Sequence, residues 1–446
     1  MKILIAGAGE VGTHLSKLLS QENQDIVLMD PDEDKLNFPN HFEIMTVEGS
    51  PISIHDLKMA GVKSADMFIA VTPDGSTNIT ACILAHHLGA KQTIARIENN
   101  EYLLPENTEL FATLGVDSLI CPEVLAADEI ISTLRQAWTR QWWEIAQGEL
   151  ILLGVKIRRN APIVNKYLHE LGSNGKNRIY HIVVIKRGNE TIIPHGFDQI
   201  LADDTIFLTT TKDHIDTIKA YAGKDDINIR KIIIMGGSPI AQILCERIPH
   251  HIDIKLLEIN KEKSYLLAEK VDSNVMVIHG DGRNTDLLIQ ENIKNCDAFI
   301  ALTGNSETNI LACLAAKNFG VSKTIAEVEN LDYIQMAEKL DIGSVINKKL
   351  IASSHIYRFL LQADVSTVKS LAFADAEVVE LVARANSKIT RKPVKDLNLP
   401  KDITLGGKIK DGKVEIVSGD THIQADDQVL IFCLNTAIRK IEDYFN

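Results

Sequence analysis

The stretch from Ile3 to Asp30 constrains the fold of this chain more than any other. A short apolar run leads into the turn GAGEVG at residues 7–12, which is followed by a helical pattern and by a second apolar run that ends at Asp30. A G-x-G-x-x-G turn between a strand and a helix, with an acid about 20 residues further on, is typical of dinucleotide-binding units. The first N–H groups of the helix would face phosphates, and Asp30 would accept hydrogen bonds from an adenosine ribose. The stretch therefore predicts a nucleotide site, and the alternative is a glycine turn that only helps packing.

Strand-like and helical patterns continue to alternate through the first quarter of the chain. Segments with helical spacing separate four further apolar runs, at residues 44–47, 67–71, 93–97 and 118–120. This alternation predicts a parallel, doubly wound sheet. Ligands of such sheets bind where the strand order reverses, at the carboxyl ends of the first and fourth strands. The glycine turn and the run Thr72–Asn78 are therefore expected to face each other across one crevice.

The same pattern returns in the second half of the chain. Gly236 lies 229 positions after Gly7 (236 − 7), and the register settles at 231 further on, where DAFIALT at 297–303 matches DMFIAVT at 66–72. Self-similarity of this kind is the signature of a tandem duplication. A second doubly wound sheet is therefore expected, with Glu258 in the place of the acid that ends the second strand.

Two smaller units, similar to each other, follow the two predicted sheets. Both contain short strand-like runs with tight turns, at 187–190 in one and at 410–413 in the other, and both end in a helical pattern. These features indicate small α+β modules. The paired acids at 203–204 and 426–427 are interpreted as turn residues before an edge strand, with a cation site as the alternative.

The predicted fold is therefore α/β, with two Rossmann-like doubly wound parallel sheets, each followed by a small α+β domain. The predicted order is a first Rossmann-like domain, a connecting helix and a small domain, then the same three parts again, with boundaries at 1–122, 123–143, 144–223, 229–348, 349–363 and 364–446. The first connecting segment contains all three tryptophans of the chain, Trp138, Trp142 and Trp143. Core packing against the small domain and a subunit interface both remain open for them.

The composition excludes several classes of protein. The formal net charge is −13, from 47 basic and 60 acidic residues, and no long Lys/Arg block could follow a nucleic-acid backbone. No apolar run approaches the ~20 residues that span a bilayer, and no signal peptide is recognisable before the first strand. The six cysteines form no C-x-x-C pair and are expected to be reduced core residues. We expect a soluble, cytoplasmic protein that binds no nucleic acid.

Two Rossmann-like units, each followed by a small α+β unit, resemble the RCK family, the regulators of K⁺ conductance whose parts are also called KTN, or TrkA-N and TrkA-C, domains. The resemblance covers nearly the whole chain and depends on KILIAGAGEVG at 2–12, VTPDGSTN at 71–78, IARI at 94–97 and IALTGNSETN at 300–309. It implies a regulator that performs no chemistry on its ligand, which would be NAD (as NAD⁺ or NADH) or ATP and ADP. It also implies a homo-oligomeric ring, a dimer or a tetramer, peripheral on the inner face of the cell membrane, that gates a Trk-type potassium-translocating membrane subunit.

The first crevice is the expected nucleotide site, and the resemblance implies that Arg96 contacts the phosphates there. A guanidinium fork would complement the helix N-terminus in that role. The expected contacts are Gly7, Ala8, Gly9, Glu10, Val11, Gly12, Asp30, Gly49, Ser50, Thr72, Pro73, Asn78 and Arg96.

The second crevice departs from this pattern. Ser238 replaces the glycine of closest approach, Ala241 replaces the packing glycine, and Glu327 stands where Arg96 stands (327 − 96 = 231). A carboxylate near phosphates repels them, so the second site is expected to be weaker, altered in preference or vestigial. Its expected contacts are Gly236, Gly237, Ser238, Pro239, Ile240, Glu258, Asp281 and Thr303.

Two other functions compete with this interpretation. A nicotinamide-dependent oxidoreductase would need a general acid or base that converges on the nicotinamide, and none of the fourteen histidines falls in a recognisable constellation. An RCK regulator of a different potassium channel or efflux transporter would have the same domains. The tandem duplication favours a Trk-type uptake system.

Overall fold

The structure is a computed structural model that describes residues 1–20, 24–37, 44–171, 178–360, 365–370, 376–410, 412–434, 441 and 444–445. The chain forms two compact units, residues 1–126 with 347–360 (unit 1) and residues 127–346 with 361–446 (unit 2).

Unit 1 contains the first predicted sheet. Six parallel strands lie in the order β3-β2-β1-β4-β5-β6, so the strand order reverses between β1 and β4, as the sequence predicts. Their bounds are β1 (Lys2–Ala6), β2 (Asp25–Asp30), β3 (Ile44–Glu48), β4 (Met67–Ala70), β5 (Gln92–Arg96) and β6 (Ser118–Ile120). The helices are α1 (Glu10–Ser20), α2 (Ile54–Met59), α3 (Gly75–Leu88), α4 (Pro105–Thr113) and the start of α5 (Pro122–Arg135).

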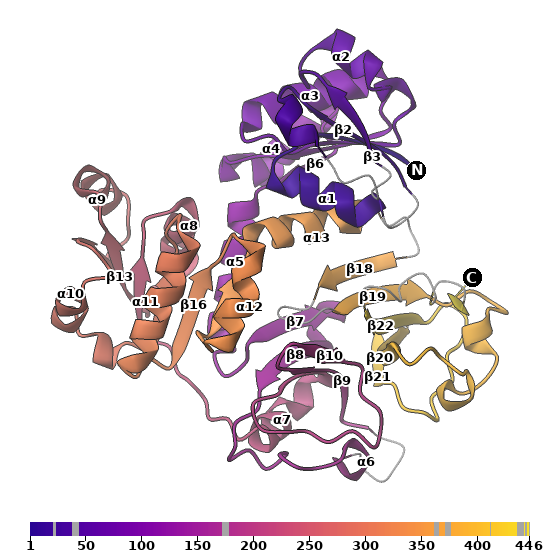
Figure 1. Cartoon of the computed structure of the whole chain (residues 1–446), viewed down its shortest axis with the longest axis vertical. Coiled ribbons are helices and arrows are strands. Elements are labelled where there is room, and N and C mark those ends of the chain that lie inside the picture. The colour runs from indigo at the N-terminus through magenta and orange to yellow at the C-terminus, as the bar shows by residue number, and fades with distance from the viewer. Residues whose placement is uncertain are drawn as a thin grey trace. The chain divides into compact units, whose positions relative to one another are not determined.

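Helices cover both faces of this sheet, with α3 on one face and α1 on the other (Figure 1). Strands buried on both faces need apolar side chains at nearly every position. The strands β1 and β4 satisfy this rule, since Ile3, Leu4, Ile5, Phe68 and Ile69 are all fully buried. The apolar runs of the sequence therefore form the central strands of the sheet.

Unit 2 contains the second parallel sheet. Its order, β14-β13-β12-β15-β16-β17, repeats that of the first sheet, which confirms the duplication at the level of the fold. The strands are β12 (Lys231–Met235), β13 (Asp253–Glu258), β14 (Val275–His279), β15 (Ala298–Ala301), β16 (Lys323–Glu327) and β17 (Ser344–Ile346). The helices are α8 (Pro239–Arg247), α9 (Lys261–Ala268), α10 (Thr285–Gln290), α11 (Ser306–Asn318) and α12 (Leu331–Lys339).

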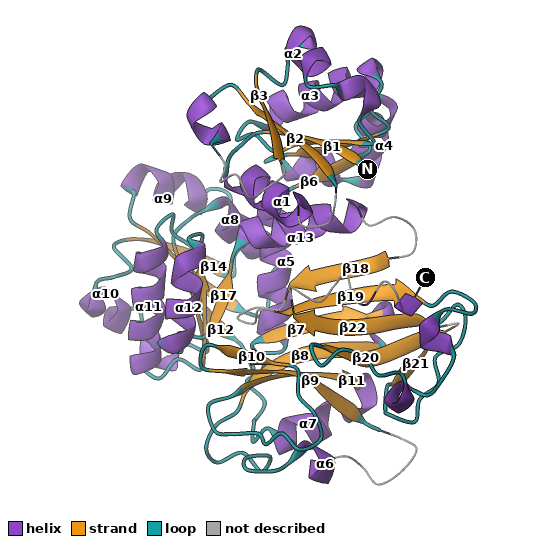
Figure 2. Ribbon diagram, turned by 45° about the vertical axis from the view of Figure 1, so that its right-hand side comes forward, coloured by secondary structure: helices purple, strands orange, loops and turns teal. Residues whose placement is uncertain are grey.

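Two five-stranded antiparallel sheets, also in unit 2, form the small domains (Figure 2). The first has the order β10-β9-β11-β8-β7, with β7 (Gln141–Ile145), β8 (Leu150–Lys156), β9 (Tyr180–Arg187), β10 (Glu190–Ile192), β11 (Thr205–Thr211), α6 (Leu168–Leu171) and α7 (Ile215–Tyr221). The second has the order β18-β19-β22-β20-β21, with β18 (Val365–Ser370), β19 (Ala376–Val382), β20 (Ile403–Lys410), β21 (Lys413–Ile416) and β22 (Gln428–Leu434). The predicted turn residue Asp411 and most of the predicted C-terminal helix lie outside the described residues.

The two small domains share one core. Phe207 of β11 and Phe432 of β22 belong to a single cluster of buried side chains. The Thr209 hydroxyl donates a hydrogen bond of 2.8 Å to the Gly406 carbonyl of the other domain. The two small domains therefore pack against each other.

The predicted connecting helix at 123–143 is wrong beyond Arg135. Helix α5 ends there, and Trp142 and Trp143 lie on the strand β7 instead. Trp138 and Trp142 belong to the core of the first small domain, and each tryptophan is only 7% exposed. Aromatic side chains favour strands with one face on a core, so the core interpretation of the tryptophans is confirmed.

The interpretation of the paired acids needs a correction as well. Asp203 and Asp426 have left-handed φ angles of 69° and 66°, as turn residues do, but the strands that follow, β11 and β22, are central and not edge strands. The second acid of the first pair, Asp204, accepts hydrogen bonds of 2.9 and 2.8 Å from the Arg187 guanidinium. Asp427 lies 3.6 and 3.5 Å from two ammonium groups, those of Lys408 and Lys410. Protein cations therefore neutralise both buried acids.

Each connecting helix contacts the Rossmann-like domain of the opposite half. Helix α13 (Lys348–Leu360) follows the second sheet in sequence but packs against α1 within unit 1. Asp128 of α5 follows the first sheet in sequence but accepts a 2.6 Å hydrogen bond from Arg247 of α8 within unit 2. The two halves of the chain thus exchange helices.

Candidate functional site

The glycine turn of the first crevice has a separate requirement at each glycine. Gly7 has a left-handed φ of 108°, and a Cβ there would lie 2.9 Å from the Thr72 nitrogen. A Cβ at Gly12 would overlap the Gly7 carbonyl oxygen, whereas a Cβ at Gly9 would meet nothing within 4 Å. Gly7 and Gly12 therefore allow close packing, and Gly9 faces open space in which a ligand can approach the backbone.

Asp30 connects the end of β2 to the glycine turn. Its carboxylate accepts a 2.7 Å hydrogen bond from the Ala8 N–H and a 3.0 Å hydrogen bond from the Asp32 N–H. The Lys35 ammonium lies 3.8 Å away, and Asp30 is only 6% exposed. The carboxylate therefore fixes the turn and is held at the edge of the crevice where a ribose would lie.

Asn78 connects the ends of β4 and β5. Its amide oxygen accepts hydrogen bonds from the Thr72 N–H (2.9 Å) and hydroxyl (2.7 Å), and its amide nitrogen donates to the carbonyls of Thr72 (3.0 Å) and Arg96 (2.9 Å). All of this hydrogen bonding is internal to the protein, and Asn78 is fully buried. Asn78 therefore positions Thr72 and Arg96, and the exposed Pro73 continues the same loop.

The turn after β3 lies beside this edge of the sheet. The Gly49 N–H donates to the Asp30 carbonyl at 3.1 Å, and the Ser50 N–H donates to the Asp56 carboxylate at 2.9 Å. A Cβ at Gly49 would lie 2.8 Å from the Asp56 side chain. The structure thus brings the turn at Gly49 and Ser50 together with the glycine turn and Asp30 at one end of the sheet.

Arg96 ends β5 at the same edge. Its nearest carboxylate is that of Glu123 on α5, at 4.0 Å, and the Arg96 side chain is 21% exposed. Among the described residues its buried Nε has no hydrogen-bond partner. A partly exposed guanidinium with an unsatisfied donor is suited to an anionic ligand.

The second crevice is a cavity of about 380 Å³ in unit 2. Six of the eight predicted residues line it, namely Gly236, Gly237, Ser238, Glu258, Asp281 and Thr303. Pro239 and Ile240 are not among the lining residues, because Pro239 begins α8 and Ile240 is almost completely buried. Two cations that the sequence reasoning missed, Lys263 and Arg283, also line the cavity.

The second crevice repeats the bracing of the first. Glu258 accepts a 3.0 Å hydrogen bond from the Gly237 N–H, as Asp30 does from Ala8. Burial raises the pKa of Glu258, but the N–H groups of Asn260 and Gly237 and the Lys263 ammonium outweigh that effect and hold the pKa below its usual value. Asn309 repeats the hydrogen bonds of Asn78. Its amide oxygen accepts from the Thr303 N–H at 3.0 Å, and its amide nitrogen donates to the Glu327 carbonyl at 2.8 Å.

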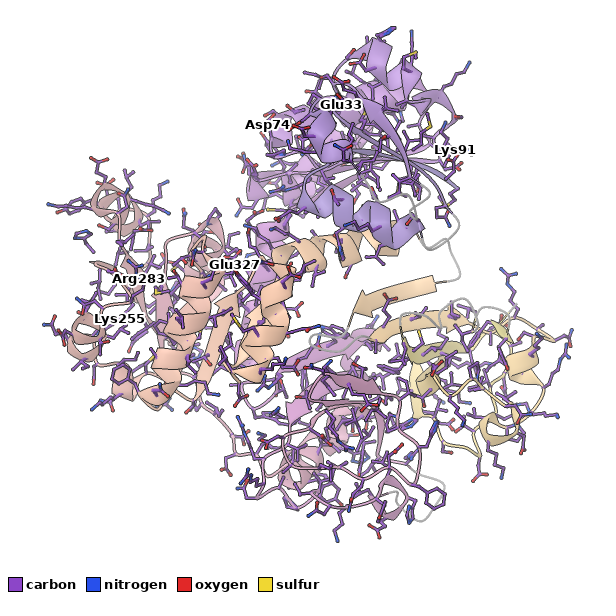
Figure 3. The ribbon with its side chains drawn as sticks, viewed as in Figure 1. Glu33, Asp74, Lys91, Lys255, Arg283 and Glu327 are labelled. Carbon is purple, nitrogen blue, oxygen red and sulfur yellow. The ribbon has the colours of Figure 1, made fainter. Side chains whose placement is uncertain are left out.

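Two differences from the first crevice concern anion binding. The Ser238 hydroxyl caps α8 by accepting a hydrogen bond from the Ala241 N–H at 3.3 Å, so one N–H group that a phosphate could use is already satisfied. Glu327, which takes the place of Arg96, is 4% exposed, and Figure 3 shows it on the same domain as Arg283. Arg283 is paired with Asp281 at 2.7 Å.

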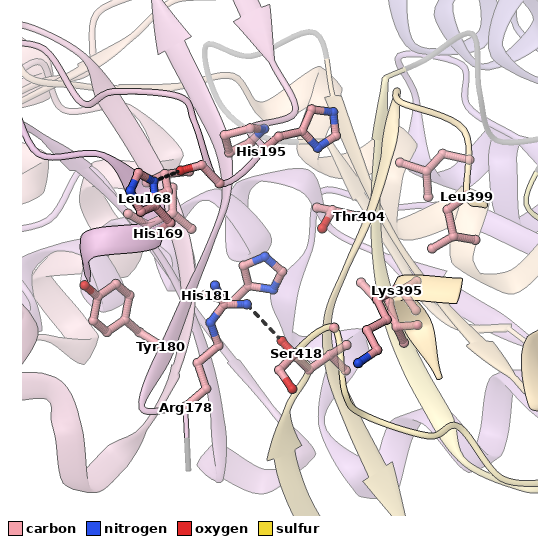
Figure 4. A pocket seen from close by; sticks show the side chains of 18 of the residues that line it. Leu168, His169, Arg178, Tyr180, His181, His195, Lys395, Leu399, Thr404 and Ser418 are labelled. Atoms are coloured by element: carbon pink, nitrogen blue, oxygen red, sulfur yellow. Dashed lines mark hydrogen bonds between the residues drawn. The ribbon is translucent and has the colours of Figure 1, made fainter. Parts of the chain in front are cut away.

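A separate cavity of about 580 Å³ lies between the two small domains (Figure 4). His181 and Arg178 approach from the first domain and Lys395 from the second, and Arg178 donates a 3.4 Å hydrogen bond to the Val417 carbonyl. Burial lowers the pKa of His181 to about 3, so its imidazole is neutral at physiological pH. No sequence motif indicated this cavity, because its lining comes from two modules far apart in the chain.

The described part of the chain has no metal site and no membrane-spanning helix. No group of three or more His, Cys, Asp or Glu side chains there could hold a metal ion, and no helix is long and apolar enough to cross a membrane. All six cysteines are buried free thiols, as predicted. The fold thus defines a tandem pair of Rossmann-like domains with a glycine turn at the carboxyl end of each sheet, each with a small antiparallel companion domain.

Comparison with known proteins agrees with this class. The TrkA-N domain model matches residues 3–122 and 232–348, and the TrkA-C domain model matches residues 152–223 and 378–446. The chain is 31% identical to the Trk system potassium uptake protein TrkA of Halomonas elongata, over 100% of this chain and 98% of that protein. It is 32% identical to the same protein of Vibrio alginolyticus, over 98% of this chain and 96% of that protein.

The chain belongs to the TrkA family, the regulatory proteins of Trk potassium uptake with tandem TrkA-N and TrkA-C domains, which are not enzymes. The RCK resemblance is thereby confirmed, and the oxidoreductase alternative is excluded. Among solved structures, a GsuK RCK domain has a TM-score of 0.59 at 17% identity and covers 100% of this chain and 94% of its own. A GsuK channel bound to NAD has a TM-score of 0.59 at 16% identity, with coverages of 100% and 78%.

Proposed function

We propose that this protein is the nucleotide-responsive subunit of a Trk system, which binds NAD⁺, NADH, ATP or ADP in the first crevice and gates the membrane subunit that translocates potassium. The observation that supports this most directly is the geometry at the carboxyl ends of β1, β2, β4 and β5. There an open Gly9, a braced Asp30 and a partly exposed Arg96 converge. Solved structures of a similar fold include a GsuK channel bound to NAD and GsuK bound to ADP.

The two crevices serve different roles in this proposal. The first crevice has Gly9 and Arg96, and the second has a serine cap and Glu327 in their places. The first crevice is therefore the stronger site, and the second is weaker or has another preference.

The protein acts as a homo-oligomeric ring on the inner face of the membrane, attached through its partner. Equivalent helices of the two Rossmann-like domains carry exposed apolar residues that suit contacts between copies. These residues are Leu104, Leu110 and Leu114 at α4, and Leu331, Met336 and Leu340 at α12. Exposed apolar patches of this kind commonly mark interaction surfaces.

Titration calorimetry on the full chain tests the proposal. Arg96→Ala should weaken nucleotide binding by about 1.5–3 kcal/mol, the range for hydrogen bonds to charged groups. Lys91→Ala is the control. Lys91 pairs with Asp66 at one end of the sheet, whereas Asp74 marks the other end, where the strands β4 and β5 lead into the proposed site (Figure 3). Unchanged affinity in Arg96→Ala would remove Arg96 from the site.

The regulatory step needs an ion-flux assay with the reconstituted membrane partner. A nucleotide shifts a gate only if it binds the open and closed arrangements with different affinity, and coupling of about 1–3 kcal/mol is typical. By reciprocity, the membrane subunit must change nucleotide affinity by the same factor. If NADH, NAD⁺, ATP and ADP all gave the flux seen without nucleotide, the gating role would be wrong even if binding were measured.

A further inference from the structure

Helix α13 brings a cation to the mouth of the first crevice from the other half of the chain. The Lys349 ammonium forms an ion pair with the Glu10 carboxylate. Glu10 is the first residue of α1 and directly follows Gly9 in the glycine turn. The Lys349 side chain is 16% exposed, while that of Glu10 is 70% exposed, so the lysine is the constrained partner of this pair.

The position of Lys349 in its own helix is unfavourable without an anion. Lys348 and Lys349 form the first turn of a 13-residue helix that has no acid there. The N-terminus of a helix carries partial positive charge, so lysines at this end are destabilising. Burial also lowers the pKa of Lys349, which adds to the cost of keeping it charged. The Glu10 carboxylate offsets part of both effects.

The matching position of the first half has the opposite charge. The second residue of α5 is Glu123, which lies 4.0 Å from Arg96, and the second residue of α13 is Lys349. Arg96 and Glu327 also differ in sign, in the reverse sense. The duplication has therefore produced a helix that contributes a cation, and this cation pairs with Glu10 at the first residue of α1.

We propose that Lys349 is a phosphate-binding and specificity-determining residue of the first crevice, where it favours nucleoside polyphosphates over the less charged dinucleotide. The proposal depends on the nucleotide site proposed above. Phosphates at the N-terminus of α1 repel the Glu10 carboxylate, and Lys349 is the cation placed to neutralise both.

The same contact gives the first crevice a direct effect on the second half. Helix α13 is continuous in sequence with the second Rossmann-like domain and the second small domain. A ligand that binds Lys349 stabilises α13 on α1. A ligand with less phosphate charge adds less to that contact.

Calorimetric titration of the full chain with ATP, ADP and NAD⁺ tests the proposal. Lys349→Gln should weaken ATP binding about tenfold, ADP binding less, and NAD⁺ binding less than twofold, so that the ATP-to-NAD⁺ affinity ratio falls. Lys349→Arg should restore most of the ratio. Glu10→Gln should strengthen ATP binding, and part of this gain should disappear in the double variant, because Glu10 also competes with the phosphates for Lys349.

The controls separate this proposal from a structural effect. Lys91→Gln removes an ion pair of the same domain at the far edge of its sheet and should leave the ratio unchanged. Binding that persists in Gly12→Ala belongs to the second crevice and is subtracted. An equal loss for all three ligands in Lys349→Gln leaves the ratio unchanged and would reveal only a loosened α13. That result, or affinities that do not change at all, would overturn the proposal while the proposed function stood. If the wild-type first crevice bound no nucleotide, both would be wrong.

Discussion

Asp341 is surrounded by cations within unit 2, and its removal should weaken that unit strongly. The Asp341 carboxylate pairs with Arg140, with Arg158 at 2.8 Å and with Lys317 at 3.0 Å. Burial raises the pKa of Asp341, but these cations outweigh burial and hold it well below its usual value. Arg140 also donates to the Gly343 carbonyl at 3.1 Å, which connects the start of the first small domain to the second Rossmann-like domain.

The substitution Asp341→Asn isolates the charge. Asp341 has a left-handed φ of 52°, and asparagine tolerates that conformation well. Removing one partner of a buried ion pair costs about 3–5 kcal/mol. Arg140 is 10% exposed, so the loss of its partner should carry most of that cost. Arg158 and Lys317 are 44% and 29% exposed, so water screens their charges and they contribute little. We therefore expect a loss of about 2–4 kcal/mol.

Urea unfolding followed by tryptophan fluorescence measures this loss, since Trp138, Trp142 and Trp143 lie in the same unit. With a denaturant slope of about 3 kcal/mol/M, the midpoint should fall by about 1 M. Asp203→Asn is the control, because Asp203 is exposed and has a similar φ of 69°. A carboxylate with a lowered pKa contributes its stability above its unfolded-state pKa and loses it as the pH falls through the folded-state pKa. The difference between wild type and variant should therefore be constant from pH 6 to 8, and a midpoint shift below about 0.2 M would refute this account of the network.

Two further substitutions test the first crevice. Gly12→Ala should abolish nucleotide binding there, because its Cβ would overlap the Gly7 carbonyl oxygen, and calorimetry showing wild-type affinity would contradict the packing argument. Asn78→Ala should destabilise unit 1 by about 2–4 kcal/mol, since buried backbone groups of Thr72 and Arg96 lose their partner. Asn309→Ala should do the same to the second Rossmann-like domain, and hydrogen exchange that showed no faster opening at the ends of β4 or β15 would argue against this bracing role.

The sequence predicted those features that depend on local pattern. Apolar runs separated by helical spacing determine a parallel sheet, and its topology alone places Gly7 and Thr72 at one edge. Strand β7 was missed because Trp138 and Trp142 also fit a helical face next to Leu134. Only the core of the small domain, which is built from distant strands, decides between the two conformations.

Features that depend on contacts between distant segments could not be predicted. Asn78 was expected to contact the ligand, but its bonds to Thr72 and Arg96 require the exact register of two parallel strands. The pair of Glu10 and Lys349 joins residues 339 positions apart (349 − 10), and it forms only because α13 packs on the opposite half. The packing of a helix on the opposite half leaves no periodic pattern in the sequence. Only the lysines at the start of α13 could have indicated that this helix has an acidic partner.

Lys323 should make the stability of unit 2 depend on pH. It begins β16, is 5% exposed, and donates a 2.6 Å hydrogen bond to the Thr139 carbonyl. Burial, together with the charges of Arg140 and Lys224, lowers the pKa of Lys323 to about 7. The unfolded chain therefore binds one more proton between about pH 7 and 10.5, and stability rises with pH across that window.

The magnitude follows from the linkage relation. Between pH 7.5 and 9.5 the Lys323 contribution should rise by about 2.5 kcal/mol, at about 1.36 kcal/mol per pH unit for one proton. Urea midpoints of wild type and Lys323→Met, measured at both pH values, isolate this group, because other titrating residues affect both proteins alike. The exposed Lys413→Met variant should follow the wild type. Parallel pH profiles for wild type and Lys323→Met would mean that Lys323 stays protonated in the folded protein, and the buried strand end would then have to hold a full positive charge beside Arg140.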